Sequence, residues 1–259
     1  MKIDELSKLH IEDIKNTEHP SVFFETQEYS ILILRLFNKK EQELHVFSKS
    51  FVITHGHEIF YYDTSTQEFS ELSKREFYKK VDSLVDASMS CVNQLVEEVN
   101  TLEESVLENK DIIKEWFSLK KQLSRVERIL LQATSINEKF FAEFAHIHKD
   151  EELKNSFEDI HEHLSRIYRA AQFNNAKLEN IYNLNSALKN EKLNSVIYVL
   201  TVISAIFLPL NLIVGFFGMN TEGLFFAGNA NGTEMVVAIL SGIFVVLALL
   251  FMKRKWLNF

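Results

Sequence analysis

The first part of the chain contains short apolar segments separated by turn residues. Five segments rich in β-branched and aromatic side chains are SVFFETQ, YSILILRLF, LHVFSKSFVITH, EIFYYD and EFSEL. Turn residues separate them at 38–40, 55–57 and 63–65. Such segments favour strands, whereas Asn, Asp, Gly and Ser favour turns. The pattern predicts an N-terminal domain over residues 1–72 with a small, mostly antiparallel sheet.

From about residue 73 the apolar positions recur every three or four residues, which is the period of an amphipathic helix. This spacing predicts two long antiparallel helices within residues 73–156, one ending near 109 and one over 111–148. The tract HKDEELKNS then predicts a turn, and a third helix begins near Phe157. Its apolar positions follow a coiled-coil seam, in which Asn174 and Asn185 also stand. The apolar seam residues are Phe157, Ile160, Leu164, Ile167, Ala171, Leu178, Ile181 and Leu188.

Two segments near the C-terminus, 193–221 and 235–252, contain no charged residue. A hydrocarbon core of about 30 Å needs about 20 apolar residues in a helix, so both segments are predicted to span a membrane. Neither Gly nor Pro interrupts residues 189–195. The third helix is therefore expected to continue into the first span as one helix over 157–218.

The charges around the spans predict their orientation. Lysines and arginines stand at 189, 192 and 253–255, the last in a basic tail over 253–259. The loop over 219–234 carries only the acids Glu222 and Glu234. Because basic residues collect on the cytoplasmic side, we expect a two-span protein of the inner (plasma) membrane with both termini in the cytoplasm.

Composition narrows the function classes. The net charge of −8 argues against a nucleic-acid partner. The single cysteine, Cys91, excludes an intramolecular disulfide and a cysteine-based zinc site. No nucleophile–base set and no Gly-rich phosphate loop occurs in the sequence. We expect a protein that is not an enzyme and takes no small organic substrate.

An uncharged polar stripe follows the predicted long helix. With Asn194 at zero and about 100° per residue, a mostly Asn, Thr and Ala face lies within roughly 40°. Its members are Asn180, Asn183, Ala187, Asn190, Thr201, Ala205 and Leu208. Asn211 and Gly215 approach it if the helix supercoils near 3.5 residues per turn. The stripe indicates either a water-filled path between equivalent helices or a solvated stalk with Thr201 bonded to its own helix.

The segment LTVISAIFLPLNLIVGFFGMN resembles the first transmembrane helix of the CorA-type divalent metal ion transporters. The resemblance extends back through FEDIHEHLSRIYRA and forward to a second span with a basic tail, over about 157–256. The N-terminal part is similar to this family only in layout, a small αβ domain followed by long helices. The resemblance implies a funnel-shaped homopentamer whose long helix lines a pore. It also implies divalent cations as substrate and as a potential regulator, mostly Mg²⁺ and sometimes Co²⁺ or Ni²⁺.

Carried over by residue, the resemblance implies that Gly218, Met219 and Asn220 form a selectivity motif at the outer mouth of the pore. Together with the stripe, it gives as pore-lining or gating positions Asn194, Leu200, Thr201, Leu208, Asn211 and Gly215. Asp159 matches an acid of a regulatory metal site between subunits, and its partner acid is unassigned. Mg²⁺ gives up its water reluctantly, so a ring of Asn220 oxygens would hold the hydrated ion without trapping it. Glu222 and Glu234 would concentrate cations at the mouth, or are ordinary loop acids.

Several features leave alternatives open. Phe217 replaces the usual Tyr before Gly-Met-Asn, Asn211 stands where Thr is common, and the loop lacks an acidic Met-Pro-Glu-Leu stretch. These departures admit a proton-coupled Zn²⁺ transporter of the same superfamily. A membrane-anchored coiled-coil scaffold or sensor without conduction is the alternative from another class. Two interpretations also remain for four histidines near the second helix hairpin: a transition-metal site, or ordinary solvated side chains. These histidines are His146, His148, His161 and His163.

Overall fold

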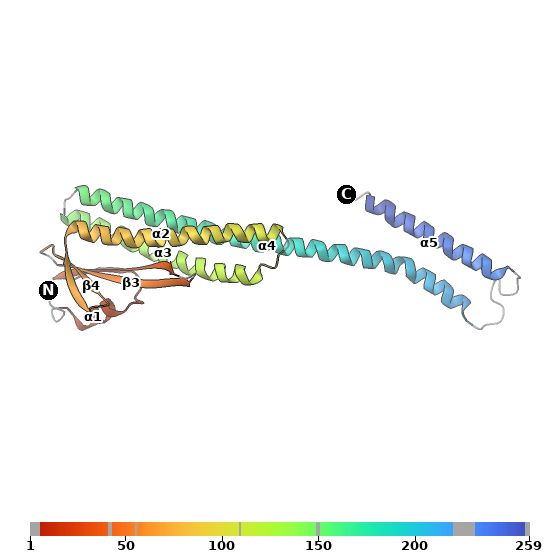
Figure 1. Ribbon diagram of the computed structural model, residues 1–259, viewed down its shortest axis with the longest axis horizontal. Helices are drawn as coiled ribbons and strands as arrows, with labels where there is room; N and C mark the ends of the chain where they lie inside the picture. The colour runs from red at the N-terminus through yellow and green to blue at the C-terminus, as the bar shows by residue number, and fades with distance from the viewer. Residues whose placement is uncertain are drawn as a thin grey trace. The chain divides into compact units, whose positions relative to one another are not determined.

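The computed structural model describes residues 6–40, 43–54, 56–108, 110–148, 151–219 and 231–256. Its elements are, in order, α1 (Lys8–Lys15), β1 (Val22–Glu25), β2 (Tyr29–Lys40), β3 (Glu43–Thr54), β4 (Ile59–Asp63), β5 (Glu68–Leu72), α2 (Lys74–Leu107), α3 (Ile113–His148), α4 (Glu151–Phe217) and α5 (Gly232–Trp256). The chain divides into two compact units, Met1–Leu184 and Asn185–Phe259; Figure 1 labels the helices and some of the strands. A small antiparallel sheet, long helices and two apolar helices are all present, so the predicted fold class is confirmed.

The five strands form one antiparallel meander in the order β1-β2-β3-β4-β5. The longest pairing, between β2 and β3, runs from Tyr29 opposite Thr54 to Lys40 opposite Glu43. The prediction of a turn at 38–40 is wrong, because these residues pair with β3 and extend β2. The Lys39 side chain is only 5% exposed and forms an ion pair with Glu98 of α2, which holds this end of the hairpin against the helix.

Helices cover both faces of the sheet, and successive strand side chains point to opposite faces. One core combines α1 and its flank with alternate strand positions: Leu6, Ile14, Tyr29, Ile31, Ile33, Val52, Phe60 and Tyr62. On the other face, ring centroids lie 4.9 Å apart between Phe51 and Phe77 of α2, and 5.3 Å apart between Phe23 and Phe140 of α3. The sequence pattern did not predict α1, which spans eight residues and buries Ile14. So short a helix depends on tertiary packing rather than on its own propensity.

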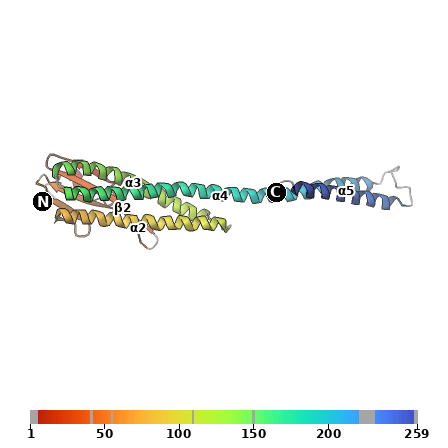
Figure 2. The ribbon, with the colours of Figure 1, turned by 90° about the horizontal axis from the view of Figure 1, so that it is seen from above.

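α2, α3 and the first part of α4 run alongside one another in the first unit (Figures 1 and 2). The beginning of α2, the last part of α3 and the beginning of α4 meet in an aromatic cluster that we define as Phe77, Phe140 and Phe157. The Phe157 centroid of α4 lies 5.5 Å from each of the other two rings. All three side chains are fully buried, so this cluster fixes the three helices to one another.

The start of α2 and the seam of α4 explain the position of these helices. Ser73 caps α2 in a capping box: its hydroxyl accepts from the Glu76 N–H, and the Glu76 carboxylate accepts from the Ser73 N–H. The seam residues predicted on α4 are buried as far as Ile181. Asn174 within the seam is buried as well, and its amide donates to the Ala170 carbonyl at 2.9 Å. The seam therefore tolerates a polar residue that satisfies itself on its own helix.

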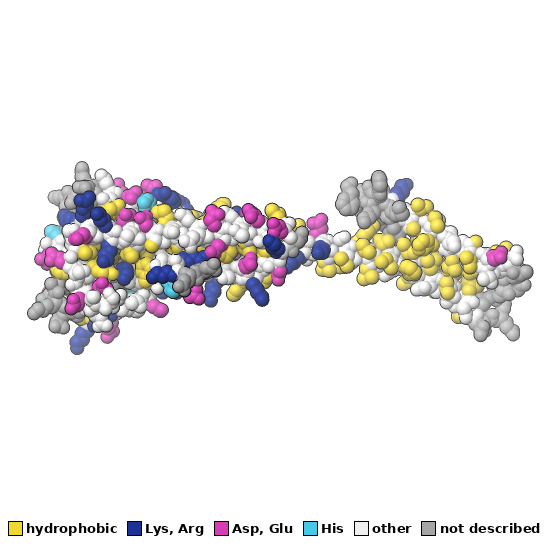
Figure 3. Space-filling model, viewed as in Figure 1, with side chains coloured by type: hydrophobic (Ala, Val, Ile, Leu, Met, Phe, Trp, Pro, Cys, Tyr) yellow, Lys and Arg dark blue, Asp and Glu magenta, His cyan; other side chains and the backbone are white. Residues whose placement is uncertain are grey.

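α4 has 67 residues and passes from the first unit into the second; at 1.5 Å per residue it is roughly 100 Å long. It begins at Glu151 rather than near Phe157, because part of the tract predicted as a turn consists of good helix formers. α5 likewise exceeds the predicted 235–252. Both helices are long and apolar enough to cross a membrane. Figure 3 shows hydrophobic side chains gathered over the second unit and charged side chains over the first.

Candidate pore helix and metal-binding residues

The predicted polar stripe continues along the part of α4 that belongs to the second unit. Asn194, Thr201, Asn211 and Leu200 are exposed, and Leu208 is 70% exposed. No described residue from 186 to 219 is buried in the single chain. The whole circumference of this segment is therefore available to water, lipid or other copies of the helix.

The Thr201 hydroxyl donates to the Ile197 carbonyl oxygen of its own helix at 2.8 Å. The hydroxyl proton is thus already used, while the oxygen keeps acceptor capacity toward the outside of the helix. The geometry shows the back-bonding that one interpretation of the stripe expected. It is equally compatible with a Thr201 oxygen that faces water or a hydrated cation.

α4 continues through Pro209 without ending. Proline has no N–H, so the carbonyl of Ala205 loses its helical donor. Ala205 belongs to the polar stripe, and its free carbonyl adds one acceptor near Thr201 and Leu208. Within a membrane such a group needs water or a neighbouring helix as a partner.

The end of α4 carries the first residues of the predicted selectivity motif. The Gly218 N–H donates to the Val214 carbonyl at 2.9 Å, and the Met219 N–H donates to the Phe216 carbonyl at 3.3 Å. A Cβ at Gly218 would stand 3.2 Å from the Val214 oxygen, which is a tight contact with backbone. Glycine at 218 therefore lets the chain close the last turn without strain. At Gly215 a Cβ would meet no atom within 4 Å, so nothing within the chain requires glycine there.

The remaining mouth residues are only partly described. Asn220 and Glu222 lie outside the described residues, so their predicted roles stay predictions. Glu234 stands in the first turn of α5. A carboxylate at this place interacts favourably with the helix dipole, which gives Glu234 a structural role besides the predicted outer-mouth role.

Asp159 lies in a group of acids between α4 and α2. Its Oδ1 is 3.6 Å from His163 Nε2, one turn along α4. Across from them, Asp82 and Asp86 lie one turn apart on α2, and ligand atoms of Asp82, Asp86 and His163 all lie within 4.8 Å of one another. Burial raises the pKa of the Asp82 carboxyl, and repulsion from Asp86 and Asp159 adds to the rise. Sequence analysis missed Asp82 and Asp86, although two acids four apart on one helix face were a visible signal.

The four predicted histidines are not all placed. His146 and His148 belong to the end of α3, where the structure does not describe side chains. On α4, His161 Nε2 lies 3.4 Å from the Ser165 hydroxyl, whereas His163 pairs with Asp159. His161 and His163 thus make different contacts, as expected for helix positions two apart.

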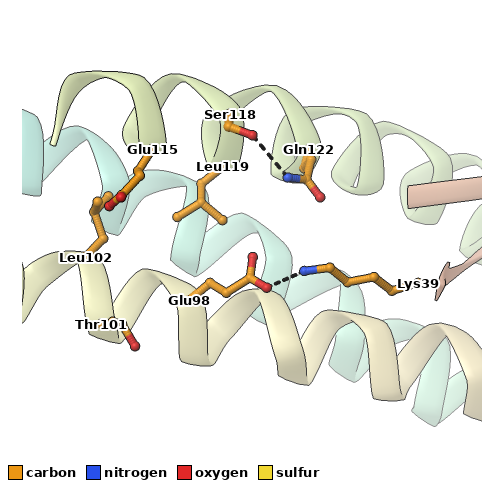
Figure 4. A pocket seen from close by; sticks show the side chains of 8 residues that line it. All are labelled: Lys39, Glu98, Thr101, Leu102, Glu115, Ser118, Leu119 and Gln122. Atoms are coloured by element: carbon orange, nitrogen blue, oxygen red, sulfur yellow. Dashed lines mark hydrogen bonds and ion pairs between the residues drawn. The ribbon is translucent and has the colours of Figure 1, made fainter. Parts of the chain in front are cut away.

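A cavity of about 430 Å³ lies between α2 and α3 (Figure 4). Its lining comprises Lys39, Glu98, Thr101, Leu102, Glu115, Ser118, Leu119 and Gln122. In Figure 4 the Lys39 ammonium points at the Glu98 carboxylate, and Gln122 bonds Ser118. The Lys39 ammonium is therefore neutralised within the fold.

Cys91 is also buried, and burial raises the pKa of its thiol to about 11, so it remains protonated and offers no thiolate ligand.

The first unit combines a sheet with long helices, and its longest helix, α4, ends in an apolar segment. Together with the apolar α5, this arrangement is that of a membrane protein with a large domain outside the bilayer. The chain matches the model of the CorA-like Mg²⁺ transporter protein family over residues 2–254. It therefore belongs to this family, whose named members are transporters of metal ions rather than enzymes.

Individual relatives agree with this assignment. The cobalt/magnesium transport protein CorA of Thermotoga maritima is 25% identical over 96% of this chain and 76% of its own length. A putative metal ion transporter of Bacillus subtilis, YfjQ, is 24% identical over 70% of this chain and 57% of its own length. Among solved structures, the CorA magnesium transporter from Methanocaldococcus jannaschii has a TM-score of 0.79 at 17% identity, covering 96% of this chain and 84% of that one. The ZntB cytoplasmic domain from Vibrio parahaemolyticus has the same fold at a TM-score of 0.53 and 9% identity, covering 73% of this chain and 81% of that one.

Proposed function

We propose that this protein conducts divalent cations, Mg²⁺ foremost and also Co²⁺ or Ni²⁺, through a pore that copies of α4 line together. The observation that carries the proposal is the uncharged stripe of amide and hydroxyl side chains on α4, which continues from the soluble unit into an apolar segment. Within the described part of the chain, no hydrogen bond joins Asn194, Thr201 or Asn211 to another element, so such bonds do not explain their presence on a membrane helix. Polar residues in a membrane helix face protein or a water-filled cavity.

Self-association follows from the exposure of α4. A helix of this length is not stable without packing, and residues 186–219 include no buried residue in the single chain. The soluble part of α4 also exposes Phe173 and Leu184, which border a shallow cavity of about 330 Å³. Copies of the chain are the partner that covers both regions. A homopentamer, as the family resemblance implies, arranges the stripes around one axis.

The chemistry of the lining suits a hydrated ion. Neutral amide oxygens of Asn220 would hold the outer water of Mg²⁺, whereas carboxylates there would slow its release. Gly218 lets α4 close its last turn two positions before Asn220 in the sequence. Leu200 and Leu208 would form apolar rings that close the pore by dewetting. Both termini of such a protein lie in the cytoplasm of an inner-membrane topology, as the basic flanks predict.

A second candidate is a Zn²⁺ transporter driven by a proton gradient. The fold likeness to the ZntB cytoplasmic domain supports it, as do Phe217 and Asn211 at positions where the magnesium pattern differs. The name of the Thermotoga maritima relative, which mentions cobalt and magnesium, supports the first candidate. Asp159 at a contact between subunits would let cytosolic metal favour a closed state, provided that the metal binds that state more tightly.

Metal uptake into proteoliposomes tests the proposal. The wild type is compared with Asn220→Ala for Mg²⁺, Co²⁺, Ni²⁺ and Zn²⁺, and Asn93→Ala on the exposed face of α2 serves as the matched control. We expect Asn220→Ala to abolish selective uptake while Asn93→Ala behaves as the wild type. Uptake of Zn²⁺ that requires a proton gradient would favour the second candidate. Unchanged uptake by Asn220→Ala would show that Asn220 does not form the selectivity filter.

A further inference from the structure

The cavity of about 430 Å³ between α2 and α3 combines apolar side chains with charged ones. Its apolar part consists of Leu102 and Leu119, which are only 2% and 6% exposed. Among the lining residues, Glu98 and Glu115 carry carboxylates and Lys39 carries the one ammonium, so the lining has a net charge of −1. An excess of negative charge in a hollow attracts cations and repels anions. The cavity therefore favours a ligand that combines positive charge with apolar surface.

Gln122 gives an independent indication of a ligand with hydrogen-bond donors. Its Nε2 donates to the Ser118 hydroxyl at 3.4 Å. Its Oε1 is buried and has no hydrogen-bond partner in the described part of the chain. Figure 4 shows this oxygen pointing away from Ser118 and toward the α2 side of the cavity. A buried amide oxygen without a donor costs free energy, and an N–H group of a ligand would remove that cost.

The α2 side of the cavity also presents acceptors. The Glu98 Oε1 accepts from Lys39, whose side chain is 5% exposed. This leaves the second Glu98 oxygen, which Figure 4 shows directed toward α3, to accept a further hydrogen bond. The Thr101 hydroxyl donates to the Glu97 carbonyl at 3.0 Å, so the Thr101 oxygen is left as an acceptor. Groups of this kind are complementary to an ammonium, which has donors only.

Glu115 supplies the second negative charge, at the other end of the cavity. In Figure 4 the carboxylates of Glu115 and Glu98 stand on either side of Leu119. Glu115 belongs to the first turn of α3, where the helix dipole favours the ionised form. It precedes Gln122 by seven residues, which is about 10.5 Å along the helix axis. Two acceptor ends with an apolar side chain between them match a molecule that has a donor at each end and a hydrocarbon middle.

We propose that this cavity binds an aliphatic diamine or short polyamine, with one ammonium group between Glu98 and Gln122 and the other at Glu115. The methylene chain lies on Leu102 and Leu119. Ammonium–carboxylate hydrogen bonds are about twice as strong as neutral ones, and each buried methylene adds to the affinity. The ligand ties α2 to α3 and is held rather than transported. The site does not depend on the proposed conduction, since its residues lie in the first unit, outside the apolar helices.

A divalent metal ion fits this lining less well than a diamine. Mg²⁺ requires oxygen ligands close to an octahedron and concentrates its charge at one point. The Lys39 ammonium stands beside Glu98 and repels a compact double charge there. A diamine places its second charge at the end away from Lys39. At that end Lys110 does not replace the ligand, because it pairs with Glu108 at 2.5 Å, and its raised pKa comes mainly from Glu108 and only to a small degree from Glu115.

Calorimetric titration with cadaverine tests the proposal on the full-length protein in nanodiscs of zwitterionic lipid, with the signal of empty nanodiscs subtracted. Glu115→Gln removes the charge at one end of the cavity. Glu104→Gln is the matched control, because it removes the same charge from an exposed position on α2 outside the lining. We expect one cadaverine per chain, with an affinity that falls roughly tenfold or more in Glu115→Gln and stays within about twofold in Glu104→Gln. Gln122→Leu, which removes the buried acceptor, should weaken binding as well, and circular dichroism establishes that each variant is folded.

A comparison of ligands on the wild type keeps the proposal falsifiable without any variant. Pentylamine has the same hydrocarbon chain with a single ammonium group, so it should bind roughly tenfold more weakly than cadaverine. Equal affinity for the two amines would overturn the proposal, as would displacement of cadaverine by equimolar Mg²⁺ at matched ionic strength. Equal cadaverine binding by the wild type and Glu115→Gln would overturn it too. Asn220→Ala should bind cadaverine like the wild type, so failure of the pore and failure of this site give different results.

Discussion

Truncation of Phe157 tests the packing that holds the pore helix to the rest of the chain. Its ring is 1% exposed and lies 5.5 Å from both Phe77 and Phe140. Replacing a buried Phe by Ala costs about 3–5 kcal/mol, because the transfer free energy is lost and a cavity remains. The cavity would open between three helices whose backbones are fixed at this point, which limits relaxation. We therefore expect Phe157→Ala to lower the free energy of unfolding of the first unit by about 3–5 kcal/mol.

Trp116 provides the assay. Its ring lies 4.8 Å from Tyr182, and its indole N–H donates to the Leu178 carbonyl at 2.8 Å, so its fluorescence reports the contact of α3 with α4. Urea unfolding of the full chain in nanodiscs is followed in a Trp256→Phe background, which leaves one tryptophan. The control is Phe117→Ala, since Phe117 is 65% exposed on α3 and should change the free energy by less than about 0.5 kcal/mol. Equal losses in both variants would refute the reasoning.

Three further predictions concern residues of the first unit. Ser73→Ala should destabilise α2 by about 0.5–2 kcal/mol in urea unfolding, because it removes the N-cap. Hydrogen bonds from Ser73 lower the pKa of Glu76 below 4.5. The stability that Glu76 contributes is thus present above pH 4.5 and is lost as pH falls through the lower folded pKa, so Glu76→Gln should flatten the acid side of the pH–stability curve. Cys91 should resist a maleimide at pH 8 in the folded chain and react on unfolding, since it is buried and its pKa is about 11.

The periodicity of apolar residues was sufficient to predict most of the fold. The strands around Ile31 and Phe51 were predictable because they are continuous runs of β-branched and aromatic residues, which the structure buries on both faces. The seam that begins at Phe157 was predictable because it buries one helix face at a regular spacing. Where local composition competes with tertiary packing, the prediction was wrong or incomplete. Residues 38–40 look like a turn, yet the ion pair of Lys39 with Glu98 and the pairing with β3 keep them in a strand.

The candidate site was predictable to a smaller degree, for a physical reason. The stripe through Asn194 and Thr201 lies on one helix, so helical geometry alone relates its members. The group of Asp82, Asp86 and His163 joins two helices separated by α3 in the sequence, and its formation depends on the packing register of α2 against α4. The spacing of residues within one helix does not predict the register of α2 against α4. Sequence analysis therefore identified Asp159 and His163 without the acids that face them.

The claim that α4 borders water within the membrane is tested most directly by cysteine accessibility. In a Cys91→Ala background, Thr201→Cys and Ile203→Cys are each treated in proteoliposomes with a charged, membrane-impermeant methanethiosulfonate. The two positions lie on opposite sides of the helix at about 100° per residue. We predict that Thr201→Cys reacts and that the reaction blocks Mg²⁺ uptake, while Ile203→Cys stays unmodified and active. Modification of Ile203→Cys alone, or of neither, would contradict an aqueous path along the stripe.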